Sequence, residues 1–258
     1  MSETLPGAPG VAAATTVPKP PSNLYRGYVM VMLFLVYAFN FLDRQIISIL
    51  AIPIREELGL DDRQLGLLGG IAFALLYSVL GVPIAWLADR TNRVWIITIS
   101  LGIWSGFTAL CGMAQNFWQL FAARVGVGVG EAGGVAPSYS LIADYFPPQA
   151  RARALAFYSL GIPLGSAFGV IAGAQIASGN VGEGLDWRWA FIIVGLAGVV
   201  LAPIFRLTVR EPARGQLDTV KLDAKAAKPS FFAVIRVLLK KPAFWFLTFG
   251  ATCSSMMG

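Results

Sequence analysis

The chain has 258 residues, of which 56% are hydrophobic and 13% charged, and its formal net charge is +6. Long apolar stretches recur along it, which is typical of a polytopic membrane protein and excludes a soluble globular domain. The sequence contains no histidine, which excludes histidine-based zinc sites, general bases and proton relays. Its two cysteines lie far apart in apolar stretches and predict neither a disulfide framework nor a thiolate metal site. No combination of basic and aromatic residues indicates nucleic-acid binding.

The N-terminal segment 1–24 is rich in proline, alanine and threonine and lacks the basic start and apolar run of a signal peptide. We therefore expect a disordered tail. The first apolar span, at about 28–54, contains the adjacent pair Asp43 and Arg44. Helical periodicity places several polar side chains of this span on one arc. They are Tyr37, Asn40, Arg44 and Ser48, with Asp43 at the edge of the arc.

A short charged connection follows, in which Asp61 or Asp62 is placed to cap the next helix. The second span, at about 65–87, contains glycines suited to close packing, and the third span, 94–114, is almost wholly apolar. The loop between these two spans is strongly charged. Its charged residues are Asp89, Arg90 and Arg93.

The fourth apolar segment, 117–143, is long enough for a helix that crosses a bilayer, yet it contains Arg124 and Glu131. Their separation of seven residues is two helical turns, so both side chains point the same way. The same periodicity places Gly128, Ser138 and Tyr139 near that face. The opposite face is a strip of small residues for helix packing. This strip consists of Gly126, Gly130, Gly133 and Gly134.

The fifth span, 154–177, has a glycine at every fourth position from Gly161 to Gly173, which predicts a packing seam. A polar loop at 178–186 precedes the sixth span, which ends near residue 207. The segment 208–241 is charged and polar, and its part from Phe231 onward predicts a short amphipathic helix on the membrane surface. Residues 242–258 begin a seventh apolar stretch that is too short to span, so we expect more protein to follow.

These elements predict an all-α integral membrane fold. It comprises a cytoplasmic tail (1–24), a six-helix bundle (25–207), a linker (208–241) and an incomplete seventh helix (242–258). Basic residues concentrate on one side of the predicted membrane, in the loops near Arg90 and Arg151 and in the segment 206–241. By the positive-inside rule this side, with the N-terminus, is cytoplasmic.

Counting the helical rise from the cytoplasmic side places Asp43 and Arg44 between the levels of Glu131 and Arg124, near the middle of the membrane. Two acids and two arginines at one depth can neutralise each other, which lowers the cost of burial. They can equally exchange partners when a proton or an anionic ligand enters. The alternative is a static ion-pair staple between the first and fourth helices, but charges at this depth usually mark a pathway.

Six spans, a long cytoplasmic linker and a seventh span resemble the N-terminal half of a major facilitator superfamily transporter. The segment from Gly81 to Arg93 is similar to that superfamily's signature between its second and third helices, although Ala85 and Asn92 stand where glycines are usual. Arg124 and the glycines after it match its fourth-helix signature. The fifth helix is similar to the antiporter motif, but Ile162 precedes the proline where that motif has glycine. Antiport is therefore not inferred.

More narrowly, three sequences resemble the Spinster subfamily, whose members are linked to the export of sphingosine-1-phosphate and lysophospholipids. They are Asn40-Phe-Leu-Asp43-Arg44, Trp86-Leu-Ala-Asp-Arg-Thr-Asn-Arg93 and Gly128-Val-Gly-Glu131-Ala. The resemblance implies alternating access between two halves with substrate near the midplane. It also implies a cytoplasmic gate, for which the alternative is ordinary positive-inside charge. The gate residues would be Asp89, Arg90, Arg93 and Arg151.

We therefore expect a proton-linked secondary transporter, embedded in the lipid bilayer, that moves a lysolipid or a substrate like sphingosine-1-phosphate. Asp43, Arg44, Arg124 and Glu131 would couple proton and substrate. The residues Tyr37, Asn40, Ser48, Gly128, Ser138 and Tyr139 would line the cavity. The alternatives are a transporter of a soluble organic anion, sugar or drug, and a membrane-embedded lipid enzyme. No phosphate-binding loop, cofactor or metal site is expected, and the expected partner is the missing C-terminal half.

Overall fold

The computed structural model describes residues 21–177, 186–218 and 230–257. Within these ranges every regular element is a helix, so the predicted all-α fold is confirmed. Most of the predicted tail, most of the predicted polar loop and the linker part 219–229 lie outside the described residues. The helices are α1 (Asn23–Ile49), α2 (Ala51–Leu58), α3 (Asp62–Gly66), η1 (Leu67–Ile71, a π-helix), α4 (Ala72–Ala88), α5 (Arg93–Cys111), α6 (Phe117–Glu131), α7 (Val135–Tyr145), α8 (Pro148–Ser159), α9 (Gly161–Ala177), α10 (Trp187–Thr208), α11 (Phe231–Leu239) and α12 (Pro242–Met257).

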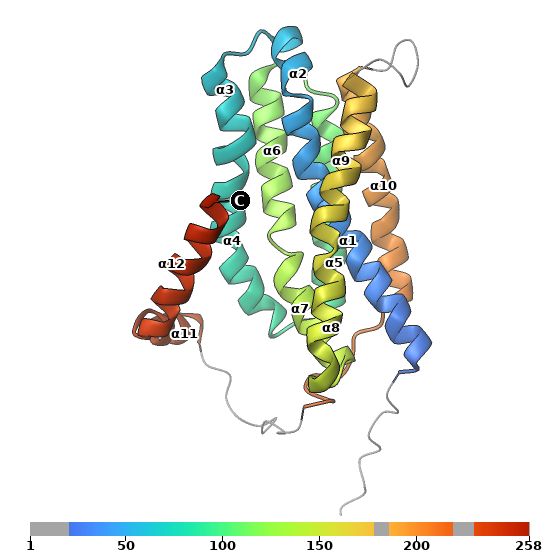
Figure 1. Cartoon of the computed structure of the whole chain (residues 1–258), viewed down its shortest axis with the longest axis vertical. Coiled ribbons are helices and arrows are strands. Elements are labelled where there is room, and N and C mark those ends of the chain that lie inside the picture. Colours follow the sequence, from blue (N-terminus) through green and yellow to red (C-terminus); the bar gives the residue numbers. More distant parts are fainter. Residues whose placement is uncertain (1–20, 178–185, 219–229, 258) are drawn as a thin grey trace, which may run out of the picture.

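The helices form an upright bundle (Figure 1). By length and apolar composition, α1, α5, α8 together with α9, and α10 are long enough to cross a membrane. The two other predicted crossings are each built from shorter helices that follow one another along the bundle, α3–η1–α4 and α6–α7. All six predicted spans therefore coincide with helical segments of the bundle. The lower end of the bundle in Figure 1 carries the start of α1 and the α4–α5 and α7–α8 connections, and the upper end carries α2.

The fourth crossing differs from the prediction, because the continuous helix expected over 117–143 is interrupted at residues 132–134. Pro137 has no backbone N–H and therefore fits the first turn of a new helix, α7, better than the interior of a long one. Short turn bonds bridge the gap, with the N–H of Gly134 donating to the carbonyl of Glu131 at 3.0 Å. Glu131 consequently occupies the last position of α6, at a break midway along the crossing.

The first crossing is also shorter than predicted, since α1 ends at Ile49 and a separate short helix, α2, follows. Pro53 in the first turn of α2 lacks the N–H that a continuing helix would need, which explains the boundary. At the start of α3 the side chain of Asp61 accepts from the N–H of Gln64 at 2.6 Å, and Gln64 accepts back from the N–H of Asp61 at 3.0 Å. This capping box confirms the predicted cap.

Glycine faces bring the helices of the bundle close together. The seam on α9 packs on α1, where a Cβ added at Gly165 would lie 2.2 Å from the carbonyl oxygen of Ala38. The strip on α6 packs on α5, where a Cβ at Gly130 would lie 2.5 Å from the backbone nitrogen of Trp104. Both predicted packing faces are confirmed. They leave the opposite side of α6 for its charged residues.

The upper end of the bundle is clamped by Glu57 of α2. Its carboxylate accepts from Nε1 of Trp187 at 2.6 Å and from the guanidinium of Arg188, at the start of α10. The hydrogen bond from Arg188 is the main cause that holds the pKa of Glu57 below its ordinary value. Arg188 also donates to the carbonyl of Ala114 at 3.1 Å, so one arginine joins α2, α10 and the α5–α6 connection.

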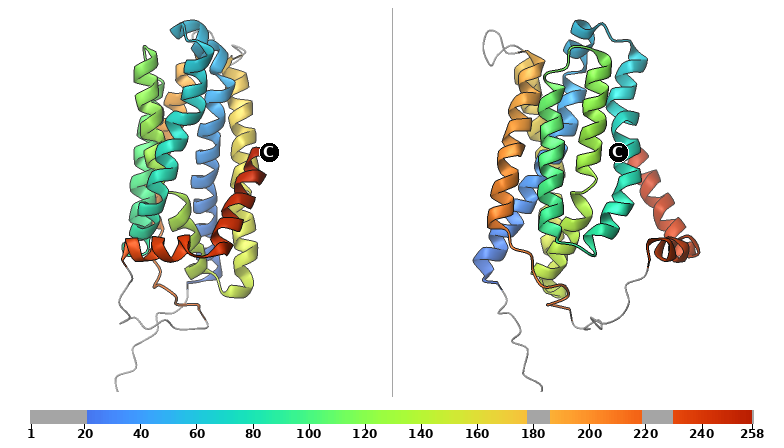
Figure 2. Two further views of the ribbon diagram at one scale, coloured as in Figure 1. Left: turned by 90° about the vertical axis from the view of Figure 1, so that its left-hand side faces the viewer. Right: turned by 180° about the vertical axis from the view of Figure 1, so that it is seen from behind.

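After α10, residues 209–218 turn beneath the bundle, and α11 and α12 then lie beside it, next to α4 (Figure 2). A short helix is present where an amphipathic one was predicted, as α11. The ring of Phe231 meets the edge of Trp86 on α4 with centroids 6.0 Å apart. Most of the side chains of α11 and α12 that are described are exposed.

Candidate functional site

The structure brings together the four ionisable residues that the sequence analysis placed at one depth. Asp43 and Arg44 come from α1, and Arg124 and Glu131 come from α6. We call these four residues the buried charge cluster. Three of them are almost completely buried, with exposed fractions of 1% for Asp43, 2% for Arg124 and 0% for Glu131. Charges so deep in a bundle require partners, and the structure pairs each acid with an arginine of the other helix.

The pair Arg44–Glu131 is tight. Nε and Nη2 of Arg44 lie 2.9 Å and 2.8 Å from Oε2 of Glu131. The guanidinium also lies over aromatic rings, with its central carbon 4.6 Å from the ring centroid of Phe73 and 4.9 Å from that of Tyr77. The side chain of Arg44 is 27% exposed, so this pair is the accessible part of the cluster.

The pair Arg124–Asp43 is loose. Nη1 of Arg124 lies 4.0 Å from Oδ2 of Asp43, which is too far for a hydrogen bond. The hydrogen bond that Asp43 does receive comes from a third helix, since Oγ1 of Thr108 on α5 donates to Oδ2 at 2.8 Å. The two pairs therefore differ in kind: one is closed by hydrogen bonds and the other is held only by electrostatic attraction.

Several polar atoms of this region have no hydrogen-bond partner among the described residues although they are buried. They are Oδ1 of Asn40, Oδ1 of Asp43, Oε1 of Glu131, and Nε and Nη1 of Arg124. Unsatisfied buried groups of this kind are costly and require an explanation, of which a functional role is one and a bound water or ion is another. Both carboxylates thus retain a free oxygen that can accept a proton or a donor, and Arg124 retains N–H groups that can donate to an anion.

The tyrosines of the predicted cavity lining stack against one another. They lie more than one helical turn from the buried charge cluster, toward the lower end of the bundle. The ring of Tyr37 stacks on that of Tyr158 with centroids 4.2 Å apart and an interplanar angle of 9°. Tyr139 meets Tyr158 edge-on at 5.6 Å and is 42% exposed. Tyr158 is a member of this group that the sequence analysis did not single out.

The remaining predicted lining residues are in different surroundings. Asn40 is 3% exposed, whereas Ser48 is exposed. The hydroxyl of Ser138 donates to the carbonyl of Gly134 at 2.7 Å, inside the turn between α6 and α7. Gly128 packs on α4, where an added Cβ would lie 2.8 Å from the carbonyl oxygen of Phe73. Close helix packing therefore accounts for this glycine.

At the lower end, Arg93 is buried in a network that ties α5 to α7 and to the segment after α10. It donates to the carboxylate of Asp144 and, through Nε at 2.7 Å, to Oε1 of Glu211. Its Nη1 also donates to the hydroxyl of Ser140 at 2.8 Å. The exposed fraction of Arg93 is only 1%, so its interactions are shielded from water.

The other predicted gate residues lie around this network. Nη2 of Arg151 lies 2.5 Å from Oδ1 of Asp218, and Nε of Arg151 donates to the carbonyls of Ala143 and Phe146. The guanidinium of Arg90 lies over the ring of Trp86 at 4.0 Å. Asp89, beside Arg90, is exposed at the α4–α5 connection.

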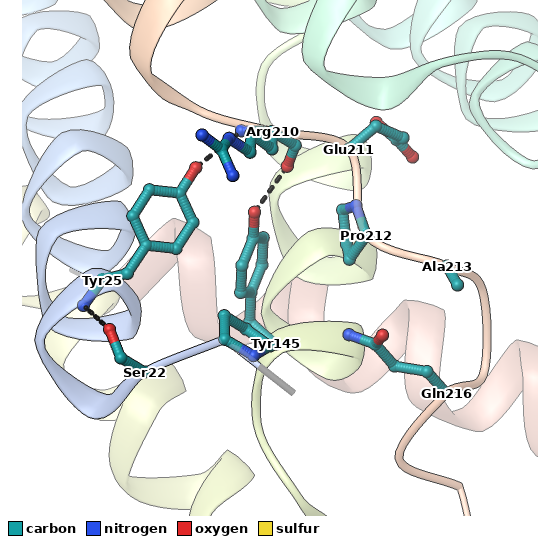
Figure 3. A pocket seen from close by; sticks show the side chains of 9 residues that line it. Ser22, Tyr25, Tyr145, Arg210, Glu211, Pro212, Ala213 and Gln216 are labelled. Carbon is teal, nitrogen blue, oxygen red and sulfur yellow. Dashed lines mark hydrogen bonds between the residues drawn. The ribbon is translucent and has the colours of Figure 1, made fainter. Parts of the chain in front are cut away.

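The lower end also contains a pocket of about 760 Å³ between the start of α1 and residues 210–216 (Figure 3). Two tyrosines hold this segment. The hydroxyl of Tyr25 accepts from the N–H of Arg210 at 2.9 Å, and that of Tyr145 donates to the carbonyl of Arg210 at 2.5 Å. These contacts anchor the chain after α10 and lie apart from the buried charge cluster.

Sequence reasoning missed the residues that complete these sites. Thr108 gave only a weak signal, because it is one of four hydroxyl side chains in an otherwise apolar span. Asp144 and Glu211 are 51 and 118 residues from Arg93, and no periodicity relates positions so far apart. Across the described ranges, no three histidine, cysteine or acidic side chains gather as a metal site. The ionisable groups of the buried charge cluster are two carboxylates and two guanidinium groups.

Comparisons with known proteins agree with this architecture. The model of the Major Facilitator Superfamily matches residues 33–258. The crystal structure of a bacterial homolog to the human lysosomal transporter Spinster, inward-facing and unoccupied, has a TM-score of 0.76 and 41% identity over 90% of this chain and 52% of that chain. Protein spinster homolog 1 of Xenopus tropicalis is 33% identical over 226 residues, which are 87% of this chain and 42% of that protein.

A third relative, a probable L-galactonate transporter of Escherichia coli, is 28% identical over 257 residues, covering 93% of this chain and 55% of that protein. The chain thus spans about half the length of the relatives that it matches. The family match covers most of the chain, and the similarity to spinster proteins extends over the same region. The chain belongs to the Major Facilitator Superfamily, a family of transporters rather than enzymes, and is similar to its spinster proteins.

Proposed function

We propose that this chain forms the N-terminal half of a secondary active transporter that moves an anionic amphiphile, such as a lysolipid, by proton-linked alternating access. The buried charge cluster is the observation that carries the proposal. Both of its carboxylates and the guanidinium of Arg124 retain buried polar atoms that have no hydrogen-bond partner among the described residues. Permanent ion pairs that only hold two helices together would be more stable if these atoms had hydrogen-bond partners. A site that exchanges protons and ligands must leave some of them available.

Asp43 and Glu131 would be the proton-coupling groups. Each faces an arginine, and an arginine nearby favours an ionised acid, whereas removal of water favours the neutral acid. A conformational change that opens the cavity alters both effects. Proton uptake by an acid would release its arginine, and the released arginine would be free to bind an anion. Coupling of proton and substrate follows from this exchange of partners.

Arg44 and Arg124 would bind the anionic head group. A guanidinium holds a phosphate through two parallel N–H donors, which an ammonium group does not reproduce. The apolar tail would lie along α1, beside Phe34, Phe39 and Phe41. Burial of each tail methylene contributes about 0.8 kcal/mol, so affinity should rise with chain length until the cavity is filled.

A soluble organic anion is the second candidate substrate, and the similarity to a probable L-galactonate transporter favours it. Both candidates need cationic donors at the cluster, but only the amphiphile needs an apolar path. Dependence of affinity on tail length therefore separates them. In either case the second half of the transporter would face this chain across the cavity, as in the superfamily.

For orientation, we propose that the lower end of the bundle, which carries the N-terminus of α1, is cytoplasmic. The arginines near both lower connections and the basic residues after α10 fit the positive-inside rule. Asp89, Arg90, Arg93 and Arg151 would then form the cytoplasmic gate. In this role, the network of Arg93 would hold the N-terminal half together while the gate opens and closes.

The test uses a hybrid transporter in which residues 1–258 replace the matching half of the bacterial spinster homolog. Uptake of a lysolipid phosphate and of its dephosphorylated analogue into proteoliposomes is compared for the hybrid and its Arg124→Lys variant. We expect the variant to lose more affinity for the phosphate form, because the charge remains but the paired donors are lost. The exposed Arg153→Lys change is the matched control.

Equal loss for both ligands, or affinity that is indifferent to tail length, would contradict the lysolipid substrate and leave the soluble anion. Residues 1–258 alone should not catalyse transport, because the cavity lies between two halves. Uptake by liposomes that contain only residues 1–258 would contradict the proposal that a second half is required.

A further inference from the structure

Thr108 of α5 occupies an unusual position between a helix carbonyl and a member of the buried charge cluster. Its Oγ1 lies 2.8 Å from Oδ2 of Asp43 and 2.9 Å from the carbonyl oxygen of Trp104. The residue is 1% exposed, so water does not reach the hydroxyl freely. It is the hydrogen-bond donor that the structure provides to Asp43 within the described ranges, because Arg124 remains 4.0 Å away.

A hydroxyl has one hydrogen and can donate it to only one of these two oxygens at a time. When Asp43 is ionised, its carboxylate only accepts, so Thr108 donates to it. When Asp43 is protonated, the acid can donate to the oxygen of Thr108, and Thr108 can then donate to the carbonyl of Trp104. The same side chain therefore serves both protonation states of Asp43 without any movement of a helix.

The charged and titratable groups that face Asp43 are few. Arg124 and Glu131 approach from α6, Arg44 lies next to Asp43 on α1, and the thiol of Cys111 lies on α5 one turn beyond Thr108. The other helices that pack on α1 place no charge at this depth. α9 has no charged residue, α10 has arginines only near its two ends, and the charged residues of α2, α7 and α8 lie at the ends of the bundle.

We propose that Thr108 is a positioning residue that holds the carboxyl group of Asp43 in one place in both protonation states and favours its ionised state. The proposal deepens the proposed function, since it rests on proton exchange at Asp43. A hydrogen bond to an ionised acceptor is roughly twice as strong as one between neutral groups. The bond from Thr108 to Trp104 adds little in the neutral state, because that carbonyl already accepts a bond from the backbone of α5.

Thr108→Val keeps the shape of the side chain and removes the hydroxyl. We expect the pH at which Asp43 loses its proton to rise by about one unit, the shift that corresponds to a tenfold change in the proton equilibrium. Thr108→Ser restores a hydroxyl and should restore the original midpoint. Thr98→Val is the matched control, because Thr98 lies on the same helix and donates only to the carbonyl of Val94, at 2.8 Å.

The measurement is infrared titration of the 258-residue chain in liposomes. The carboxylic-acid C=O band of Asp43 is identified by its loss in Asp43→Asn, and its intensity is followed against pH. The band of Thr108→Val should also lie at higher wavenumber, because the acid has lost its hydrogen-bond partner. A change that was merely structural would alter neither the band position nor the titration midpoint.

The proposal is overturned if Thr108→Val titrates like the unsubstituted chain or like Thr98→Val, or if Thr108→Ser behaves like Thr108→Val. These outcomes concern only Thr108 and leave the transport proposal intact. Absence of any titration at Asp43 contradicts both, because proton exchange at this carboxyl is then lost. A titration that shifts as expected in a chain whose hybrid does not transport supports the role of Thr108 and contradicts the proposed function alone.

Discussion

Glu131→Gln tests whether the tight pair of the cluster stabilises the bundle through its charge. The side chain of Glu131 is completely buried, and both contacting nitrogens of Arg44 share one of its oxygens. Glutamine has nearly the same size and keeps a carbonyl oxygen at this position. The substitution therefore removes the negative charge, leaves the packing in place and retains one hydrogen bond, donated by the guanidinium of Arg44 to the amide oxygen.

Removal of one member of a buried ion pair typically costs about 3–5 kcal/mol, because the other charge remains buried without a partner. Three features reduce this value here. Arg44 is 27% exposed, so water partly solvates its guanidinium, and the hydrogen bond that the guanidinium still donates to the amide oxygen contributes about 1.5 kcal/mol. The rings of Phe73 and Tyr77 also attract the cation. We therefore expect Glu131→Gln to lower the free energy of unfolding by about 2–3 kcal/mol.

The assay is equilibrium unfolding of the 258-residue chain in lipid bicelles, followed by tryptophan fluorescence. Glu56→Gln is the matched control, because Glu56 is an exposed carboxylate on α2 and its loss should change stability by less than about 0.5 kcal/mol. The double variant Arg44→Met/Glu131→Met removes both charges and should be more stable than Glu131→Gln. A loss for Glu131→Gln within the range of the control, or a double variant less stable than Glu131→Gln, would refute the reasoning.

Three further predictions concern packing, the lower network and the upper clamp. Gly165→Ala should destabilise the bundle by about 1–3 kcal/mol through a clash with α1, whereas Gly102→Ala, with nothing within 4 Å of the added Cβ, should be neutral or slightly stabilising in the same unfolding assay. Arg93→Met should release the segment 209–218 and speed its cleavage by trypsin, and an unchanged rate would contradict the anchoring role. The lowered pKa of Glu57 contributes stability above about pH 4.3 that is lost as the pH falls further. The stability difference between the unsubstituted chain and Glu57→Gln should therefore shrink in acid, and a difference that grows in acid would be inconsistent with this sign.

Much of the bundle could be predicted because the length of a helix and its packing face depend on residues that are close together in the sequence. Apolar stretches of sufficient length predicted six segments that are helical in the structure, and the four-residue glycine repeat of α9 predicted the face that packs on α1. The relative height of residues along the bundle was also predictable, since a fixed rise per residue converts position along a helix into height. The helical rise per residue correctly predicted that the acids and arginines of α1 and α6 lie close together.

The features that were not predicted from the sequence depend on geometry that helical periodicity does not describe. The break at residues 132–134 arises from small residues before Pro137. Because the helix is interrupted there, helical periodicity does not predict which residues of α6 and α7 lie on the same face. The partners of Arg93 come from distant positions that only the folded chain brings together. In the sequence, Thr108 is an ordinary member of an apolar span. Its proposed role depends entirely on its hydrogen bond to Asp43, which only the folded chain reveals.

The central claim is that the buried acids couple proton movement to transport. The most direct test is lysolipid uptake by the hybrid transporter in proteoliposomes, measured with and without an imposed pH gradient. We predict that the gradient stimulates the unsubstituted hybrid and that Asp43→Asn abolishes this stimulation while exchange of substrate without a gradient persists. Equal stimulation of the unsubstituted hybrid and of both Asp43→Asn and Glu131→Gln would contradict the account and reduce the cluster to a structural staple.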